Sequence, residues 1–257
     1  GFIREMPYFC NFEGTDVNSK WAFAQEEQTD KWYIGVDAAF EVSEDKSNTD
    51  SALYISYDNG LSMQYFNNGK DKTMMPESYS WAYVTIYLEK GKYDVSYDWT
   101  CTGMPHPKAP EEMAFDFMKV MLIPTTSTFT GGSSQITALN GMNTNLMDAM
   151  NITGGGKFDL TPGRKVAFLA NNNGWSTAEM EITVTEEEAG IYNLVVYWNN
   201  AQPDGDPIIR SGAIDNISIV PQTCMAPIDF KMTRFDNESA DFTWPSLESG
   251  AEFIIKA

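Results

Sequence analysis

Histidine, cysteine and basic residues are scarce in this chain of 257 residues. One histidine, His106, and three cysteines, Cys10, Cys101 and Cys224, cannot build a structural zinc site of any usual ligand spacing. Only 17 basic residues stand against 36 acidic ones, and the formal net charge of -19 repels nucleic-acid phosphates and anionic lipids. No apolar run approaches the ~20 residues of a membrane-spanning helix. We therefore expect no nucleic-acid partner and no membrane insertion.

Signatures of catalysis are also scarce. His106 is the one possible base of a Ser-His or Cys-His pair, and a lone histidine in a loop such as Met104-Pro105-His106-Pro107 is usually plain surface. No two carboxylates stand out by their spacing, as a glycoside hydrolase would require. Gly154-Gly155-Gly156-Lys157 fails as a phosphate loop because Phe158 stands where Ser or Thr is needed. We expect a protein that is not an enzyme.

Aromatic and β-branched residues are abundant and fall in short runs between turn signals. Hydrophobic residues make up 42% of the chain and aromatics 13%, which indicates a folded, globular protein. Residues 80–88 and 115–123 have the composition of strands, whereas 125–156 is rich in Thr, Ser, Gly and Asn and is typical of a loop. Many short strands with almost no helical periodicity predict an all-β, antiparallel sandwich.

Two further runs look like counterpart strands. Residues 93–99 and 192–198 each follow a glycine turn, start with Tyr and end with Trp. Side chains two residues apart share one face of a strand. We therefore predict that one face of each strand forms the core, namely Tyr93, Val95, Tyr97, Trp99, Tyr192, Leu194, Val196 and Trp198.

The character of the sequence changes after Val220. Residues 1–220 have the length of one sandwich domain. Residues 221–257 begin with a linker, Pro221 to Pro227, and then show three strand-like runs. So short a segment cannot bury an independent sandwich core. We interpret it as the incomplete start of a second β-domain.

The stretch Gly212 to Val220 closes the first domain and carries an unusual carboxylate. Ile214, Ile217 and Ile219 are typical of a buried strand, but Asp215 interrupts them. A carboxylate inside an apolar strand is costly unless something pairs with it, and a hard cation is one possible partner.

The ordered motifs of the first domain resemble a known family. Cys10-Asn11-Phe12-Glu13 with Trp21, and Ala213 to Ser218 with Cys224, resemble the opening and closing signatures of MAM-type jelly-roll domains. The run from Met6 to Val220 is more similar to their bacterial relatives, the choice-of-anchor J or cleaved-adhesin domains of secreted and surface proteins. The segment after Cys224 resembles the first strands of a fibronectin type III module. The resemblance implies a jelly-roll β-sandwich outside the cytoplasm, although the second cysteine of the MAM opening is absent here.

The resemblance also implies a structural calcium ion between the two ends of the domain. Glu13 and Asp215 match the motif positions, and Asp37 and Asp30 are the nearest candidates in the sequence for a further ligand. Calcium takes about 6 to 8 oxygen ligands, so carbonyls and waters would complete the set. The alternative is that Glu13 and Asp215 only accept hydrogen bonds from backbone groups at strand ends.

Aromatic side chains are candidates for stacking on a sugar. Trp175 is the strongest, because it lies in the polar loop Asn171-Asn172-Asn173-Gly174-Trp175-Ser176, whose amides suit hydroxyl recognition. We name Trp175, Asn173, Trp32 and Tyr33 as the candidate ligand-binding residues. For any single tryptophan, including Trp81, the alternative is a place in the core.

Three cysteines allow at most one intramolecular disulfide, and Cys10 with Cys224 is the candidate because it would join the two domain ends.

The sequence as a whole favours a monomeric adhesion or carbohydrate-binding module of a secreted or cell-surface bacterial protein, with a glycan or a host or surface protein as partner. A structural spacer or protein-interaction module of a larger surface protein is the alternative, and a glycoside hydrolase is the third reading.

Overall fold

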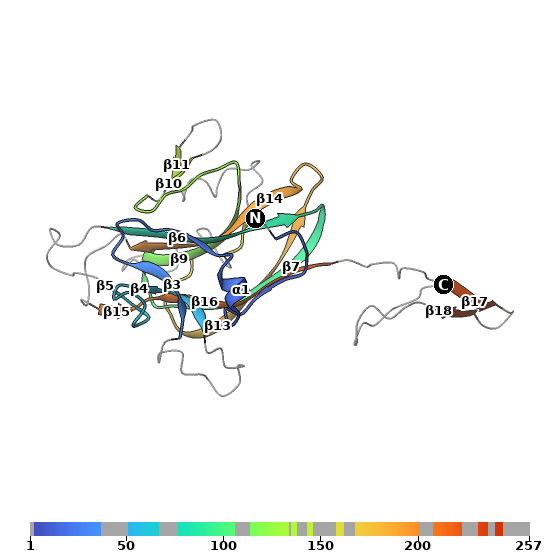
Figure 1. Cartoon of the computed structure of the whole chain (residues 1–257), viewed down its shortest axis with the longest axis horizontal. Coiled ribbons are helices and arrows are strands. Elements are labelled where there is room, and N and C mark those ends of the chain that lie inside the picture. The colour runs from blue at the N-terminus through green and yellow to red at the C-terminus, as the bar shows by residue number, and fades with distance from the viewer. Residues whose placement is uncertain are drawn as a thin grey trace. The chain divides into compact units, whose positions relative to one another are not determined.

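The computed structural model describes residues 3–36, 51–66, 77–105, 114–133, 135–137, 143–145, 158–161, 168–200, 208–222, 231–235 and 240–243. The chain divides into two compact units, Gly1–Pro221 and Gln222–Ala257. The first unit is built on two large antiparallel β-sheets in stacked layers (Figure 1). In the second, β17 (Lys231–Phe235) pairs antiparallel with β18 (Ala240–Thr243). The predicted all-β, antiparallel sandwich is confirmed, whereas the fibronectin-like identity of the second unit stays a prediction.

One layer, which we call the β14 sheet, is built around β14 (Gly190–Asn200). Its neighbours on either side are β6 (Ser78–Leu88) and β9 (Ala114–Pro124). Three short strands extend the sheet: β2 (Ala22–Ala24) beside β6, and β12 (Phe158–Asp159) and β8 (Met104–Pro105) beside β9. Ile3 adds an isolated parallel bridge to Ile86.

The other layer, the β16 sheet, is built around β16 (Gly212–Pro221). On one side β16 pairs with β7 (Gly91–Cys101), which pairs in turn with the edge strand β13 (Asn172–Val184). On the other side it pairs with β4 (Ala52–Ser56), which leads to the edge strand β3 (Lys31–Gly35). The first strand, β1 (Tyr8–Cys10), also pairs with β16. The opening and closing strands of the domain therefore lie side by side.

A two-stranded ribbon runs continuously from one sheet into the other. β6 and β14 pair from Ser78 opposite Asn200 to Leu88 opposite Gly190. β7 and β13 continue the same pairing from Gly91 opposite Val184. An antiparallel ribbon that folds over itself in this way places its two halves in facing layers, as in a jelly roll.

The main core lies between the two sheets, and the two counterpart strands β7 and β14 face each other across it. Seven of the eight predicted core residues are buried there, with Trp99 the exception. Trp99 is partly buried and packs against the margin of the core. The prediction is therefore right for the core-facing side of each of the two strands, which lie in different sheets, and wrong for the full burial of Trp99.

The first unit also contains short strand pairs and a short helix outside its two large sheets. β5 (Gln64–Phe66) pairs with β15 (Ile208–Arg210), and β10 (Gln135–Thr137) pairs with β11 (Asn143–Asn145). The helix α1 (Thr15–Asn18) is a single turn. Within the described ranges, no helix is long and apolar enough to cross a membrane.

Candidate ligand-binding site

A bulge in the edge strand β13 presents Trp175. Asn172 pairs with Cys101 and Ser176 pairs with Trp99, so residues 173–175 lie opposite the single residue Thr100 of β7. Extra residues on one strand bend it and redirect its side chains. The polar loop predicted to carry ligand-binding residues is therefore a bulge within a strand, and it contains both Asn173 and Trp175.

Hydrogen bonds from two neighbouring strands hold the bulge. Arg210 Nη1, at the end of β15, donates to the Asn173 carbonyl oxygen at 2.8 Å. The Thr102 hydroxyl, just after β7, donates to Asn173 Oδ1 at 3.0 Å. Within the bulge, Asn172 Nδ2 donates to Ser176 Oγ at 3.0 Å. Asn173 is exposed and Trp175 is half-buried, so both remain at the protein surface.

Trp175 and Tyr33 border a small apolar cluster on the outer face of the β16 sheet. The buried members of this cluster are Ala52, Tyr54, Met63 and Ala213. Tyr33 lies opposite Tyr54, and Tyr54 opposite Ala213, so they form one row across three strands. The structure thus places two of the predicted ligand residues, Tyr33 and Trp175, on the same outer face.

A tight turn after β4 covers the Tyr33 side of this cluster. Asn59 and Gly60 both have positive φ, 61° and 83°, which is typical of a tight Asn-Gly turn. The Tyr54 hydroxyl donates to the Gly60 carbonyl oxygen at 2.7 Å, and the Tyr33 hydroxyl donates to Asn59 Oδ1 at 3.3 Å. Asn59 therefore adds an exposed amide beside Tyr33.

The turn also carries a carboxylate with a perturbed pKa. Burial by itself would raise the pKa of Asp58, but hydrogen bonds from Ser56 and Ser62 outweigh it and lower that pKa. The Ser62 amide and hydroxyl donate to the two Asp58 oxygens at 2.9 and 2.7 Å. Burial raises the pKa of Tyr33, and the Asp58 charge adds to that shift. This side of the cluster is therefore polar and negatively charged, whereas the Trp175 side carries the cation of Arg210.

Trp32 does not belong to the site, and its assignment as a ligand residue is wrong. Only 1% of Trp32 is exposed, and its indole nitrogen donates to the Ser80 carbonyl oxygen at 3.0 Å. Successive residues of a strand point to opposite faces, so Trp32 enters the core and Tyr33 points outward.

Glu13 and Asp215 flank one junction in the β16 sheet. Along one side of β16, β4 pairs at Ala213 and Ile214, and β1 pairs from Ile217 onward. Asp215 lies between these pairings and is 1% exposed. Glu13 follows β1, and its Oε1 accepts a hydrogen bond from the Ser51 amide, just before β4, at 2.8 Å. Glu13 therefore caps a backbone group, and whether it also binds a metal stays a prediction.

Asp30 lies far from this junction. Lys31 pairs with Ser56 and Gly35 with Ala52, so Asp30 and Ser51 lie beyond opposite ends of this pairing, roughly 20 Å apart at about 3.4 Å per residue. Asp30 is fully buried, and its Oδ2 accepts a hydrogen bond from Asn200 Nδ2 at 2.7 Å. It is therefore not a ligand of the same ion as Glu13.

The remaining metal and cysteine predictions rest partly on residues outside the described ranges. Asp37 and Cys224 are among these, so the fourth metal candidate and the disulfide from Cys10 to Cys224 stay predictions. In the described part of the chain, no three acidic, histidine or cysteine side chains group closely enough to hold a metal ion. Cys10 and Cys101 are free and buried in the structure, and burial is the main cause that raises the pKa of each thiol.

No protein-family model matches the chain, and no curated protein matches it. Several solved structures are similar to it. One is the K1 cleaved adhesin domain of Lys-gingipain from Porphyromonas gingivalis, at 10% identity and a TM-score of 0.40, covering 85% of this chain and 100% of that one. Another is TmCBM61 in complex with β-1,4-galactotriose, at 10% identity and a TM-score of 0.36, covering 79% and 90%. A third is the adhesin domain of Epf from Streptococcus pyogenes, at 13% identity and a TM-score of 0.35, covering 95% and 74%.

These neighbours are carbohydrate-binding and adhesin modules by their descriptions. The likeness concerns the course of the chain, and at such low identities and TM-scores it assigns no residue and no ligand. The MAM-like and fibronectin-like resemblances stay predictions.

Several residues of the site could not be predicted from any local sequence pattern. Arg210, Thr102 and Met63 come from separate strands and turns that meet only in the fold. Asn59 was detectable as part of the Asn-Gly turn, but its position beside Tyr33 depends on the pairing of β3 with β4.

Proposed function

We propose that this chain is a non-catalytic adhesion module that binds carbohydrate through the Trp175 bulge on the outer face of the β16 sheet. The observation that carries the proposal is the bulge itself, which places a half-buried indole beside an exposed amide and a guanidinium. We further propose that the module belongs to a secreted or cell-surface bacterial protein.

The chemistry of the bulge suits a sugar. An indole face packs against the apolar face of a pyranose, and binding sites combine such rings with a few placed polar groups. The Asn173 side chain offers both a donor and an acceptor, and a guanidinium carries five N–H donors. Tyr33 and Asn59 repeat the pairing of a ring with an amide at the other side of the cluster.

A glycan array probed with the purified chain tests this proposal, with Trp175→Ala as the binding-defective variant. Phe9→Ala is the matched control, because Phe9 is 60% exposed and lies on β1, opposite Ser218 and away from the bulge. We expect selective glycan binding that Trp175→Ala loses and Phe9→Ala keeps. Absence of binding to every glycan, or equal loss in both variants, contradicts the carbohydrate proposal.

We also propose a structural calcium ion at the junction of β1, β4 and β16. Asp215 and Glu13 offer oxygen donors of the kind that calcium prefers, and the remaining ligands would be carbonyls, waters and Asp37. The described residues supply only two of these carboxylates, and Glu13 already accepts the Ser51 amide. The ion would tie the opening strand to the closing strand.

Thermal unfolding with calcium and with chelator tests the ion directly, because a ligand that binds only the folded state raises the melting temperature. We expect a calcium-dependent increase that Asp215→Asn and Glu13→Gln abolish. Glu186→Gln is the control, since its side chain is 80% exposed in a surface ion pair. An unchanged melting temperature in protein shown to be metal-free at the start rejects the ion.

A spacer or protein-interaction module is the second candidate function. It is favoured by Leu61, which is 83% exposed at the tip of the turn beside Tyr33. Capture of a surface protein that Leu61→Ser prevents, with glycan binding absent, supports this role in place of carbohydrate binding.

A further inference from the structure

The bulge contains an Asn-Gly pair, Asn173-Gly174, which is a potential site of covalent change. We propose that Asn173 deamidates in the folded protein, and that it does so in preference to the other described Asn-Gly pair, Asn59-Gly60. This inference goes beyond carbohydrate binding, and its test needs no ligand.

The reaction requires only water. The Gly174 amide nitrogen attacks Asn173 Cγ, forming a new N–Cγ bond in a five-membered succinimide. The Cγ–Nδ2 bond breaks, and ammonia leaves with the proton that the Gly174 amide loses. Water then adds to either ring carbonyl, and ring opening gives aspartate or isoaspartate at position 173.

Glycine is required at position 60 but not at position 174. Gly60 has a φ of 83°, and a Cβ there would lie 2.9 Å from Tyr33 Cδ1. Gly174 lies outside the left-handed region, and a Cβ there would meet no atom within 4 Å. Nothing in the fold therefore demands a glycine at position 174. The chemical consequence of a glycine at position 174 is that the amide next to Asn173 is not hindered by a side chain.

The two amide nucleophiles are also held differently. The Gly60 amide donates to Ser56 Oγ at 3.0 Å, inside the turn that Asp58 and Ser62 stabilise. The Gly174 amide makes a longer contact, 3.3 Å, with Asn172 Oδ1. Asn173 and Gly174 are both exposed, so water reaches the reacting atoms.

The target carbonyl of Asn173 accepts a hydrogen bond from the Thr102 hydroxyl at 3.0 Å. A donor at this oxygen stabilises the negative charge that develops there when the Gly174 nitrogen attacks. Asn59 Oδ1 has a longer contact, 3.3 Å, with the Tyr33 hydroxyl. The folded structure therefore assists the reaction at Asn173 and restrains it at Asn59.

Deamidation would change the bulge in two ways. It removes the amide donor at position 173 and places a carboxylate in the segment that Arg210 holds. Isoaspartate also lengthens the backbone by one atom between Asn172 and Gly174. Both changes occur beside Trp175, so the reaction would alter this surface irreversibly with age.

Peptide mapping by mass spectrometry after incubation of the full chain at mildly alkaline pH tests the proposal, in native buffer and in urea. Deamidation is detected as a mass gain of about 1 Da on the peptide that contains the asparagine. In urea we expect similar rates at Asn173 and Asn59, since both precede glycine in an unfolded chain. In native buffer we expect Asn173 to keep most of its rate and Asn59 to lose it. Asn68-Gly69 and Asn140-Gly141, which lie outside the described residues, are scored as separate peptides.

Gly174→Ala is the matched variant, because it hinders the nucleophile without straining the bulge. We expect it to keep the wild-type melting temperature and to lose most of the Asn173 product in native buffer. A second variant, Asn173→Gln, removes the product altogether. If folding suppresses the reaction at Asn173 as strongly as at Asn59, or if Gly174→Ala deamidates at the wild-type rate, the proposal is wrong.

Discussion

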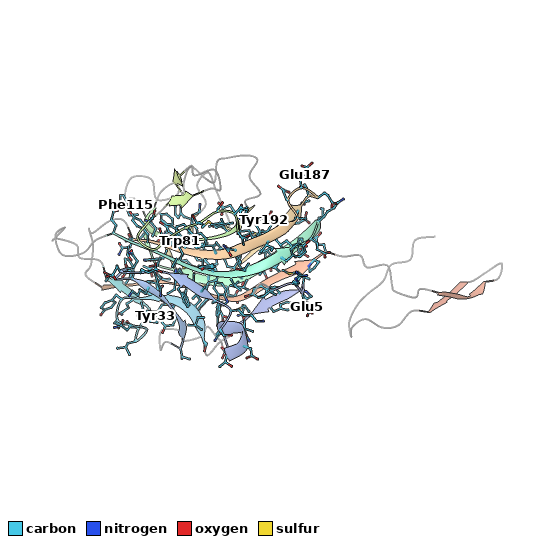
Figure 2. The ribbon with its side chains drawn as sticks, turned by 45° about the horizontal axis from the view of Figure 1, so that its top comes forward. Glu5, Tyr33, Trp81, Phe115, Glu187 and Tyr192 are labelled. Carbon is cyan, nitrogen blue, oxygen red and sulfur yellow. The ribbon has the colours of Figure 1, made fainter. Side chains whose placement is uncertain are left out.

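The two outer faces of the sandwich both carry aromatic side chains, but among the described residues the tryptophans of the two faces, Trp81 and Trp175, differ in exposure. On the β14 sheet, Trp81 and Tyr197 lie opposite each other in register and are fully buried. On the β16 sheet, Trp175 is half-buried at the bulge. Figure 2 shows Trp81 on the first sheet and Tyr33 on the second, in separate layers.

The chain covers the outer face of the β14 sheet with its own loop. Phe129 stacks on Trp81, with ring centroids 4.9 Å apart and planes at 23°. The Trp81 indole nitrogen donates to the carbonyl oxygens of Thr130 and Ser133, each at 3.1 Å, and the Gly132 amide donates to the Tyr79 carbonyl oxygen at 2.9 Å. Trp81 is therefore satisfied by the protein itself. The cover makes this face a second, smaller core.

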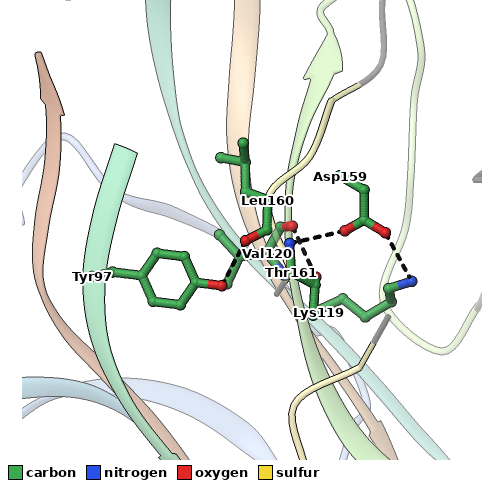
Figure 3. A network of polar contacts seen from close by, with 6 residues as sticks. All are labelled: Tyr97, Lys119, Val120, Asp159, Leu160 and Thr161. Carbon is green, nitrogen blue, oxygen red and sulfur yellow. Dashed lines mark hydrogen bonds and ion pairs between the residues drawn. The ribbon is translucent and has the colours of Figure 1, made fainter. Parts of the chain in front are cut away.

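The covered face even accommodates a lysine (Figure 3). Lys119 is 1% exposed, and its Nζ lies 3.5 Å from Asp159 Oδ2. Burial lowers the pKa of Lys119, and the Asp159 carboxylate opposes part of that shift. Asp159 Oδ1 accepts the Thr161 amide at 3.0 Å. The contrast with Trp175 shows that an outward-pointing side chain is available to a ligand only if no loop lies over it.

The largest expected effect separates the two tryptophans. Trp81→Ala should lower the free energy of unfolding by about 3–5 kcal/mol, because it empties a packed site and removes the ring on which Phe129 stacks. Trp175→Ala should cost about 1 kcal/mol or less, since its ring is half-exposed. Urea unfolding with an unchanged m-value measures both. Equal losses of unfolding free energy would mean that Trp175 is packed as tightly as Trp81. This result would count against Trp175 as a ligand-binding residue.

The two outer faces also differ in how much of their structure can be predicted from the sequence. Strands with dense β-branched and aromatic content, such as β6 and β14, were predictable because their composition leaves no alternative. Alternation separates Trp32 from Tyr33, but it does not say which of the two faces inward. The Trp175 bulge depends on the register of β13 against β7, and the cover of Trp81 depends on the course of residues 124–133. Neither is local, so neither could be read from the sequence.

A second test uses the tyrosines of the two faces at alkaline pH. Burial raises the pKa of Tyr197 well above its ordinary value of 10.0, whereas the pKa of the half-buried Tyr33 is raised less strongly. When the pKa of a tyrosine is higher in the folded than in the unfolded protein, its contribution to the free energy of unfolding is fully present below about pH 10. This contribution is lost as the pH rises from there. Tyr197 should contribute a slope of about 1.4 kcal/mol per pH unit above pH 10.

Tyr197→Phe should therefore flatten the loss of stability between about pH 9 and pH 11, and Tyr33→Phe should flatten it less. Unfolding free energies across this range measure the two slopes. Tyr197→Phe also loses the hydrogen bond to Asn199 Oδ1, which shifts the whole curve but leaves its slope unaffected. Identical slopes of the unfolding free energy against pH in the two variants would mean that Tyr197 on the covered face is as accessible to water as Tyr33 on the open face.

A third test compares the two glycines of the β16 sheet's outer face. Gly60→Ala should cost about 1–2 kcal/mol, because it puts an alanine at positive φ and its Cβ against the Tyr33 ring. Gly174→Ala should change the free energy of unfolding by less than about 0.5 kcal/mol. Thermal or urea unfolding of both variants checks the difference. A large cost at position 174 would show that the bulge needs its glycine for the fold.

The smallest expected effects concern one ion pair on each face. Lys92 Nζ lies 2.9 Å from Glu181 Oε1 on the open face, and their side chains are 56% and 47% exposed. Lys92→Met should cost about 0.5 kcal/mol at low salt and nothing at high salt, because exposed pairs are screened. Lys119→Met should change the free energy of unfolding by less than about 1 kcal/mol at any salt concentration, because an apolar side chain fills the space of Lys119 and the exposed Asp159 carboxylate stays in contact with water.

Lys119 and Lys92 also differ in how they make the free energy of unfolding depend on pH. The folded pKa of Lys119 is lowered from 10.5, so between the folded and unfolded pKa values the unfolded chain binds more protons and stability rises with pH. Lys119→Met should remove this rise, which makes the alkaline loss caused by the tyrosines steeper. Lys92→Met provides the control in the same titration. A Lys119→Met variant that loses about 3 kcal/mol would instead show that the ion pair of Lys119 with Asp159 is a main stabilising contact of the covered face.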